Sequence, residues 1–236
     1  MSGSSGPARF VPRAGFLRDN GLSLAFALLL LLALVGQAWS GSRFHDQLAR
    51  AEGLQEIGFW RYVTSSSFAV DVAENWQSEF LQFTLYIFAT VWLVQRGSSE
   101  SKKPGDEGRE SDEQQLVGDH ARPDSPRWAR VGGWRTSLYS HSLVTVMGVL
   151  FLLSWTAQLV AGRVAHNEDR LRDRLDPLGP LEYLGSPEFW NRTFQNWQSE
   201  LLAIGTMAVF AIYLRERGSP ESKEVGAPHD ATSSSD

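Results

Sequence analysis

Four apolar runs separated by polar segments form the pattern of hydrophobic and polar positions along the chain. The runs cover residues 22–39, 80–94, 143–161 and 201–214. An α-helix rises about 1.5 Å per residue and the hydrocarbon core of a bilayer is about 30 Å thick, so the first and third runs approach the length of a membrane span. The pattern predicts membrane-spanning helices. The alternative for residues 22–39 is a cleaved signal peptide, because basic residues precede the run and small residues end it.

The second half of the chain repeats the first half at an offset of about 121 residues. The pentapeptide Asn-Trp-Gln-Ser-Glu occupies residues 75–79 and again residues 196–200, and an apolar run followed by Arg-Gly-Ser comes after each copy. The correspondence extends without gaps on both sides of the pentapeptide and indicates a tandem duplication. The counterpart of the run at 22–39 is internal, which argues against a signal peptide there.

We therefore predict an all-α integral membrane protein of four helices, built from two parallel tandem hairpin repeats with interfacial helical segments and disordered tails. The repeats occupy residues 16–102 and 134–223. Two spans return the chain to its starting side, so both repeats insert in the same orientation and a pseudo-two-fold axis along the membrane normal relates them. The remaining segments, 1–15, 103–133 and 224–236, are predicted to be a disordered lead, linker and tail because they hold few apolar side chains.

Composition and charge refine this prediction in two ways. The 236 residues include no Cys, which excludes disulfides and thiolate metal sites, and the formal net charge of −5 gives no indication of nucleic-acid binding. About fourteen of the 22 Lys and Arg residues lie in the lead, the linker and the tail. This excess predicts that both termini and the linker are cytoplasmic and that the two inter-helix loops lie outside.

The second and fourth runs are short for a membrane span and are preceded by aromatic residues. Ser186, Pro187 and Glu188 have the pattern of a helix start, with an N-cap, a first-turn proline and an acid near the helix dipole. The second and fourth spans become long enough only if they are counted from Trp76 and Trp197. These two tryptophans are therefore predicted to be interfacial anchors.

The same counting brings two glutamates to the membrane boundary or slightly inside it. Glu79 and Glu200 end the two pentapeptides. Ionisable side chains at that depth are costly and usually face protein or water. In the plainer interpretation they face lipid headgroups or loop arginines. In the functional interpretation they belong to a duplicated polar layer that could bind a cation or pass protons.

This candidate polar layer combines one Gln, one His and one Glu from each repeat. Its members are Glu79, Glu200, Gln37, Gln158, His45 and His166. The Gln residues lie near the outer ends of the first and third spans, and the His residues follow about two helical turns later. We expect each pair to meet the Glu of its own repeat at one membrane face. One His and one Glu are too few ligands for a metal unless both repeats converge, so no metal site is predicted.

No motif of an enzyme is recognisable in the sequence. It contains no glycine-rich phosphate loop, nucleophile elbow or zinc motif, so we predict no catalytic residues and no cofactor. The leading hypothesis is a structural or interaction role. The alternative is a small transporter or channel, which would need a homo-oligomer because four helices are few for transport. The predicted partners are the lipid bilayer and another copy or another membrane protein, with no nucleic acid.

Several motifs resemble those of a family of uncharacterised bacterial membrane proteins, a domain of unknown function found mainly in high-GC bacteria. They are the run Arg-Asp-Asn-Gly-Leu-Ser-Leu at 18–24, the two pentapeptides, and Arg-Gly-Ser-x-Glu-Ser-Lys at 96–102 and 217–223. The resemblance implies the two-repeat membrane layout and a place in the inner membrane of a bacterium, but no activity. The first loop departs from the family pattern. A tyrosine is expected there before an acidic-Gln-Leu stretch, and this chain has Phe44-His45-Asp46-Gln47-Leu48, so the resemblance gives no role to His45.

Overall fold

The computed structural model describes residues 15–232. Residues 1–14 of the predicted lead and 233–236 of the predicted tail lie outside the described residues. Between 15 and 232 the secondary structure is helical, with no strand, which confirms the all-α prediction. The chain divides into two compact units, Met1–Phe68 and Ala69–Asp236, and each is described by itself.

The first unit contains a long helix and a short one packed on it. Its elements are α1 (Phe16–Asp19), α2 (Gly21–Ala51), α3 (Phe59–Val63) and the start of α4 (Ser66–Trp92). Tyr62 of α3 lies against α2 at Gly41, where a Cβ atom would collide with the tyrosine hydroxyl. The His45 ring lies 5.7 Å from the Tyr62 ring. These contacts fix the turn between the two helices.

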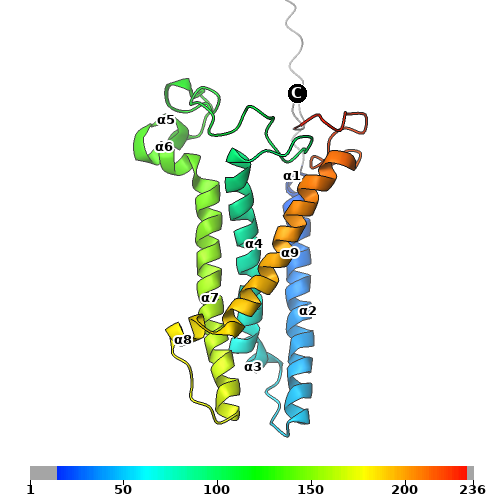
Figure 1. The fold of residues 1–236 in the computed structure, drawn as a ribbon, viewed down its shortest axis with the longest axis vertical. Helices are drawn as coiled ribbons and strands as arrows, with labels where there is room; N and C mark the ends of the chain where they lie inside the picture. Colours follow the sequence, from blue (N-terminus) through cyan, green and yellow to red (C-terminus); the bar gives the residue numbers. More distant parts are fainter. Residues whose placement is uncertain (1–14, 233–236) are drawn as a thin grey trace, which may run out of the picture. The chain divides into compact units, whose positions relative to one another are not determined.

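The second unit contains the rest of α4 and six further helical segments (Figure 1). They are the 3-10 helix η1 (Gly118–His120), α5 (Arg127–Arg130), α6 (Gly133–Ser140), α7 (Ser142–Arg172), α8 (Pro180–Leu184) and α9 (Pro187–Tyr213). The predicted start of α9 is confirmed: Pro187 is its first residue, and the Ser186 hydroxyl accepts a hydrogen bond from the Phe189 amide at 3.3 Å. This contact satisfies one of the free amides of the first turn.

Three long helices of the second unit, α4, α7 and α9, are in contact. Gly148 of α7 lies beside Thr84 of α4, and Gly162, later in α7, lies beside Val70, which is earlier in α4. The helices α4 and α7 therefore run antiparallel. Arg192, near the start of α9, reaches residues near the start of α4, and later residues of α9 meet later residues of α4. The helices α4 and α9 therefore run parallel, with α9 crossing α4 in Figure 1.

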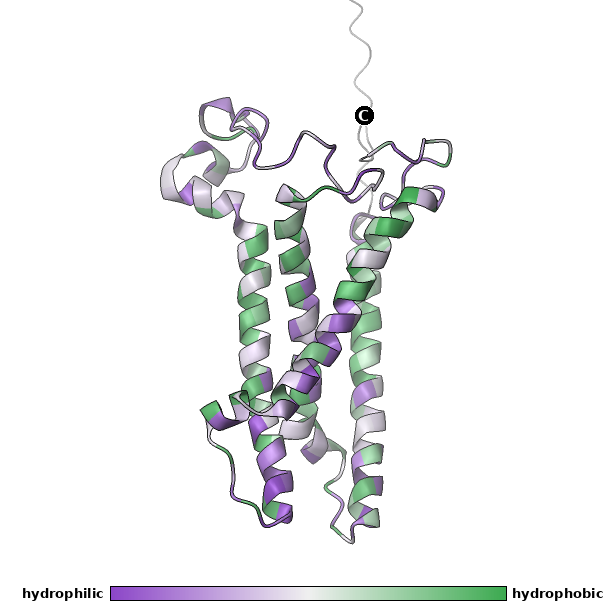
Figure 2. Cartoon of the chain, viewed as in Figure 1, coloured by the Kyte–Doolittle hydropathy of each residue, from purple (hydrophilic) through white to green (hydrophobic). Residues whose placement is uncertain are grey.

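Two helices in the described part of the chain are long and apolar enough to cross a membrane. They are α2 and α7, each 31 residues long with a strongly apolar stretch of 18 residues. Only 6% of each stretch is buried. Proteins in water rarely leave such long apolar surfaces uncovered. The sequence prediction also counted α4 and α9 as spans, but these two helices are not apolar enough over a comparable length. The N-terminal half of α9 is largely hydrophilic, as Figure 2 shows.

The same local contacts occur in both similar segments of the chain. Tyr183 of α8 approaches Gly162 of α7 as Tyr62 approaches Gly41, and the Tyr183 and His166 rings are 5.5 Å apart. The two Arg-Gly-Ser-x-Glu-Ser-Lys runs also form matching turns. The hydroxyls of the second serines, at 101 and 222, accept hydrogen bonds from backbone amides six residues earlier, at 2.8 and 2.9 Å. Similar sequence thus produces similar local contacts at both places.

The predicted linker and tail contain contacts of their own. Residues 103–133, predicted as a disordered linker, include η1 and α5. Residues 224–232 of the predicted tail lie against the turn that follows α4, where the Gly97 amide donates to Thr232 Oγ1 at 2.8 Å. The ammonium group of Lys223 donates to the carbonyls of Gly97, Pro228, His229 and Ala231. This side chain is 2% exposed.

Candidate functional site

Polar side chains of α4 and α9 face one another along a line that we call the polar seam. It comprises Asp71, Glu74, Gln77, Glu79 and Gln82 of α4 with Glu188, Arg192, Thr193, Trp197 and Glu200 of α9, joined by Gln158 and His166 of α7. Steps of three or four residues place most of these side chains on one face of each helix. Since the two helices run parallel, their polar faces stay in register over several turns.

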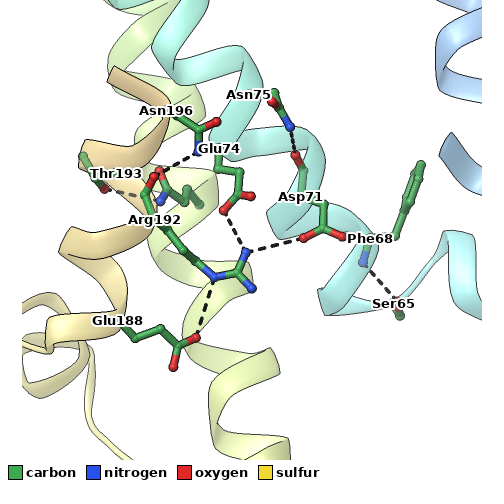
Figure 3. A network of polar contacts seen from close by, with 10 residues as sticks. Ser65, Phe68, Asp71, Glu74, Asn75, Glu188, Arg192, Thr193 and Asn196 are labelled. Carbon is green, nitrogen blue, oxygen red and sulfur yellow. Dashed lines mark hydrogen bonds and ion pairs between the residues drawn. The ribbon is translucent and has the colours of Figure 1, made fainter. Parts of the chain in front are cut away.

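The first part of the seam is a cation among three carboxylates (Figure 3). Arg192 Nη1 lies 2.8 Å from Glu74 Oε2 and 3.5 Å from Asp71 Oδ1. Its Nε lies 3.7 Å from Glu188 Oε1, one helical turn earlier on α9. Glu188 also contacts the Nδ1 atom of His166 on α7. Arg192 therefore connects α4 to α9, and Glu188 extends the connection to α7.

Asp71 and Glu74 of α4 are half-buried beside Arg192. Removal of a carboxylate from water penalises its charged form, and the Arg192 guanidinium offsets that penalty. This end of the seam is thus a partly dehydrated charge cluster. Its stability depends on each member finding its partner.

The middle of the seam joins the two copies of the pentapeptide. The Trp197 indole nitrogen donates a hydrogen bond to Gln77 Oε1 at 2.8 Å, and the Gln77 side chain is fully buried. Gln158 of α7 is also fully buried and donates from Nε2 to Thr193 Oγ1 at 3.3 Å. Within residues 15–232, Gln77 Nε2 and Gln158 Oε1 have no hydrogen-bond partner. Each glutamine thus uses one half of its amide to join two helices.

The far part of the seam contains the two glutamates of the pentapeptides. With the Gln82 amide turned so that its nitrogen donates, that nitrogen lies 2.8 Å from Glu200 Oε2 and 3.3 Å from Glu79 Oε2. A neutral amide can bridge two carboxylates but cannot neutralise them. The two acids therefore repel one another unless a proton or a cation joins them.

An aromatic cluster on α7 and α9 covers one side of the seam. Trp155 is at its centre, with ring centroids 5.6 Å from Phe151, 5.9 Å from Phe189 and 6.0 Å from Trp197. Its indole nitrogen also donates to Thr193 Oγ1 at 3.4 Å. These rings exclude water from the middle of the seam and so strengthen its polar contacts.

The structure brings together some residues of the predicted polar layer and separates others. Glu79 and Glu200 converge on Gln82. Gln158 and His166 do not meet Glu200 as expected, because they lie opposite earlier residues of α9, Thr193 and Glu188. The antiparallel run of α7 and α9 accounts for this: residues near the end of α7 face the start of α9.

The remaining predicted residues lie as follows. Gln37 and His45 belong to α2 in the first unit, where both are half-buried. Trp76, predicted as an anchor, is 43% exposed, whereas Trp197 is half-buried in the seam. In the described residues no group of three or more His, Asp and Glu side chains is arranged to hold a metal ion.

Sequence reasoning missed the ion cluster, including Asp71, Glu74 and Arg192. The search compared identical residues in the two segments, and Asp71 and Arg192 occupy equivalent positions with opposite charges. A search for complementary residues at equivalent positions would have found this pair. Gln82 has Ala203 as its counterpart and was missed for the same reason.

Comparison with known proteins places the chain in a family. A family model described as a domain of unknown function (DUF6766) matches residues 13–234. No curated protein and no solved structure matches the chain.

Proposed function

The chain belongs to the DUF6766 family, a domain of unknown function, and we propose that it is an integral membrane protein with a structural or interaction role and no catalysis. In this proposal a tandem duplication supplies four membrane helices, α2, α4, α7 and α9. Its setting is the inner membrane of a bacterium, with the lipid bilayer and other membrane proteins as partners.

The observation that carries the proposal is the Arg192 cluster. The polar groups that make α4 and α9 unsuitable for direct lipid contact are directed at one another, with Arg192 and Glu74 2.8 Å apart. Apolar side chains on the outer surfaces, such as Phe88 and Phe210, are more than half exposed. A bilayer accepts helices whose polar groups are paired inside the protein. The seam thus supports membrane residence for helices whose average composition is only moderately apolar.

The topology is testable because the chain has no Cys, so single cysteines can be introduced and labelled with a membrane-impermeant maleimide in intact cells. Four spans with cytoplasmic termini place Asp176→Cys outside and Ser111→Cys and Glu224→Cys inside, all at exposed positions. If only α2 and α7 cross the membrane and the N-terminus is cytoplasmic, Ser111→Cys lies outside and Asp176→Cys lies inside. Labelling of Ser111→Cys from outside, or release of the protein by alkaline carbonate, would contradict the proposal.

A second candidate function is the passage of protons or cations. The convergence of Glu79 and Glu200 on Gln82 favours it, because two carboxylates at membrane depth are accommodated best when they share a proton or bind a cation. Glu79 is exposed on the surface of the single chain, so a second copy would be needed to enclose the path.

The transport candidate can be tested with reconstituted vesicles. Proton or cation flux driven by a gradient should exceed that of empty vesicles, and Glu79→Gln with Glu200→Gln should abolish it. Glu216→Gln, an exposed change beyond the end of α9, is the matched control. Wild-type vesicles that are no leakier than empty ones would eliminate transport and leave the structural role in place.

A further inference from the structure

The helices α5 and α6 present a surface of arginines and aromatic side chains that the polar seam does not use. We call it the basic aromatic platform and define it by Arg127, Trp128, Arg130, Trp134, Arg135 and Leu138. All six residues are exposed. Trp134 is 69% exposed and Leu138 44%. Large apolar side chains gathered on so short a segment indicate a binding surface.

The platform has a defined structure. Gly132 and Gly133, with φ angles of 71° and 66°, make the turn between α5 and α6, a conformation that favours glycine. Thr136 Oγ1 donates to the Trp128 carbonyl at 2.6 Å, and Thr136 is buried between the helices. The Trp128 and Trp134 rings meet edge to face with centroids 6.4 Å apart. The two tryptophans are thus held on one preformed surface.

The charge of the platform is of one sign. Residues 125–167 contain no Asp or Glu, although the whole chain has a net charge of −5. Arg135 lies over the Trp134 ring with its guanidinium carbon 5.5 Å from the centroid. Arg130 donates to the Pro123 carbonyl at 3.3 Å and keeps further donors free to face solvent. An anionic partner with an apolar layer beneath its charge would complement this arrangement.

The platform adjoins a helix that is apolar enough to cross a membrane. Only His141 separates α6 from α7, and the apolar run of α7 begins at Leu143. Figure 1 shows α5 and α6 projecting sideways at the N-terminal end of α7. If α7 spans the bilayer, α6 lies at the depth of the headgroups, where Trp and Arg side chains are favoured.

From these observations we infer that the basic aromatic platform binds the headgroups of acidic phospholipids at the membrane surface. The inference rests on the proposed membrane residence of α7. Its arginines would contact lipid phosphates, while Trp134 and Leu138 enter the boundary with the acyl chains. Lipid binding by the platform would place α5 and α6 flat on the bilayer surface and fix the depth at which α7 enters the bilayer.

The inference can be tested with a fluorophore on Leu138→Cys in nanodiscs that contain lipids brominated near the headgroup end of their acyl chains. Quenching should be stronger when phosphatidylglycerol is mixed with phosphatidylcholine than in phosphatidylcholine alone. Changing Arg127, Arg130 and Arg135 together to Gln should remove that difference, since each arginine near an anionic surface contributes roughly a fivefold preference. The matched control changes Arg170 and Arg172 in the last turn of α7, together with Arg174 just beyond it.

A second label separates failure of this inference from failure of the proposed membrane residence. Val149→Cys, on an exposed position within the apolar run of α7, should be quenched in both lipid mixtures if α7 lies in the bilayer. If the label at residue 149 is quenched but quenching at residue 138 does not depend on phosphatidylglycerol, the inferred lipid binding by the platform is overturned while the membrane residence of α7 stands. A signal at 138 that changes with the number of protein copies per disc, and not with lipid charge, would assign the surface to a second copy and also overturn the inference.

Discussion

The Trp197 indole nitrogen donates to Gln77 Oε1 at 2.8 Å, so the second copy of the pentapeptide binds the first. The motif that repeats in the sequence is therefore also the motif by which α4 and α9 recognise one another. Its two copies are chemically identical, but their surroundings differ. This difference makes several substitutions informative.

We predict that Trp197→Phe destabilises the protein far more than Trp76→Phe. The first change leaves the fully buried Gln77 amide without its donor, which costs about 1–3 kcal/mol of unfolding free energy. The second alters a side chain that is 43% exposed. Unfolding of the purified protein in detergent, followed by circular dichroism, measures both. Equal destabilisation by the two variants would contradict the assigned hydrogen bond.

Removal of the cation in the charge cluster should also destabilise the fold. Arg192→Gln leaves Glu74 and Asp71 without their shared partner, and we expect a loss of about 1–3 kcal/mol because the side chain is only partly buried. Arg172→Gln breaks an exposed pair with Asp169 and should cost less than about 1 kcal/mol. Thermal unfolding in nanodiscs distinguishes them. A Tm for Arg192→Gln no lower than that of Arg172→Gln would refute the cluster's role.

Close packing of α8 on α7 predicts opposite effects for two glycines of one helix. A Cβ atom at Gly162 would lie 2.5 Å from the Tyr183 hydroxyl, whereas one at Gly148 would meet only ordinary contact at 3.8 Å. Gly162→Ala should cost about 1–3 kcal/mol through overpacking. Gly148→Ala should be neutral or stabilise the helix by up to about 1 kcal/mol.

The same contact supplies a rescue experiment. Adding Tyr183→Phe to Gly162→Ala removes the colliding hydroxyl and should restore most of the lost stability, since this double-mutant cycle isolates the one contact. Tyr183→Phe alone should be nearly neutral, because the hydroxyl has no hydrogen-bond partner among the described residues. If the double variant unfolds at the Tm of Gly162→Ala, the collision is not the cause.

The buried ammonium of Lys223 should hold the C-terminal residues in place. Lys223→Met removes the donor shared by four backbone carbonyls, and we expect limited proteolysis between 224 and 232 to accelerate severalfold. Lys102→Met is the control, since its Nζ meets a single carbonyl at Gly108 and an exposed ion pair. Unchanged cleavage in Lys223→Met would disprove this anchoring role.

The sequence predicted the helices well and the site only in part. Periodic apolar runs and the Ser186-Pro187 start follow from local chemistry, so their positions could be inferred without tertiary contacts. The partners of Gln158 and His166 could not be inferred in this way, because they depend on the relative axial position of the packed helices α7 and α9. Glu79 and Glu200 follow from the repeated motif and the length of the apolar runs after it, but their common neighbour Gln82 lies outside that motif.

The pairing of Asp71 with Arg192 has a consequence for assembly. The two residues occupy equivalent positions of the two segments, 121 residues apart. If the first segments of two chains paired in the same way, Asp71 of one chain would face Asp71 of the other. If two second segments paired, Arg192 would face Arg192. Such like-charged pairings are rejected, so the unlike pair within one chain is preferred. A chain severed in its linker should therefore reassemble only as a one-to-one heteromer.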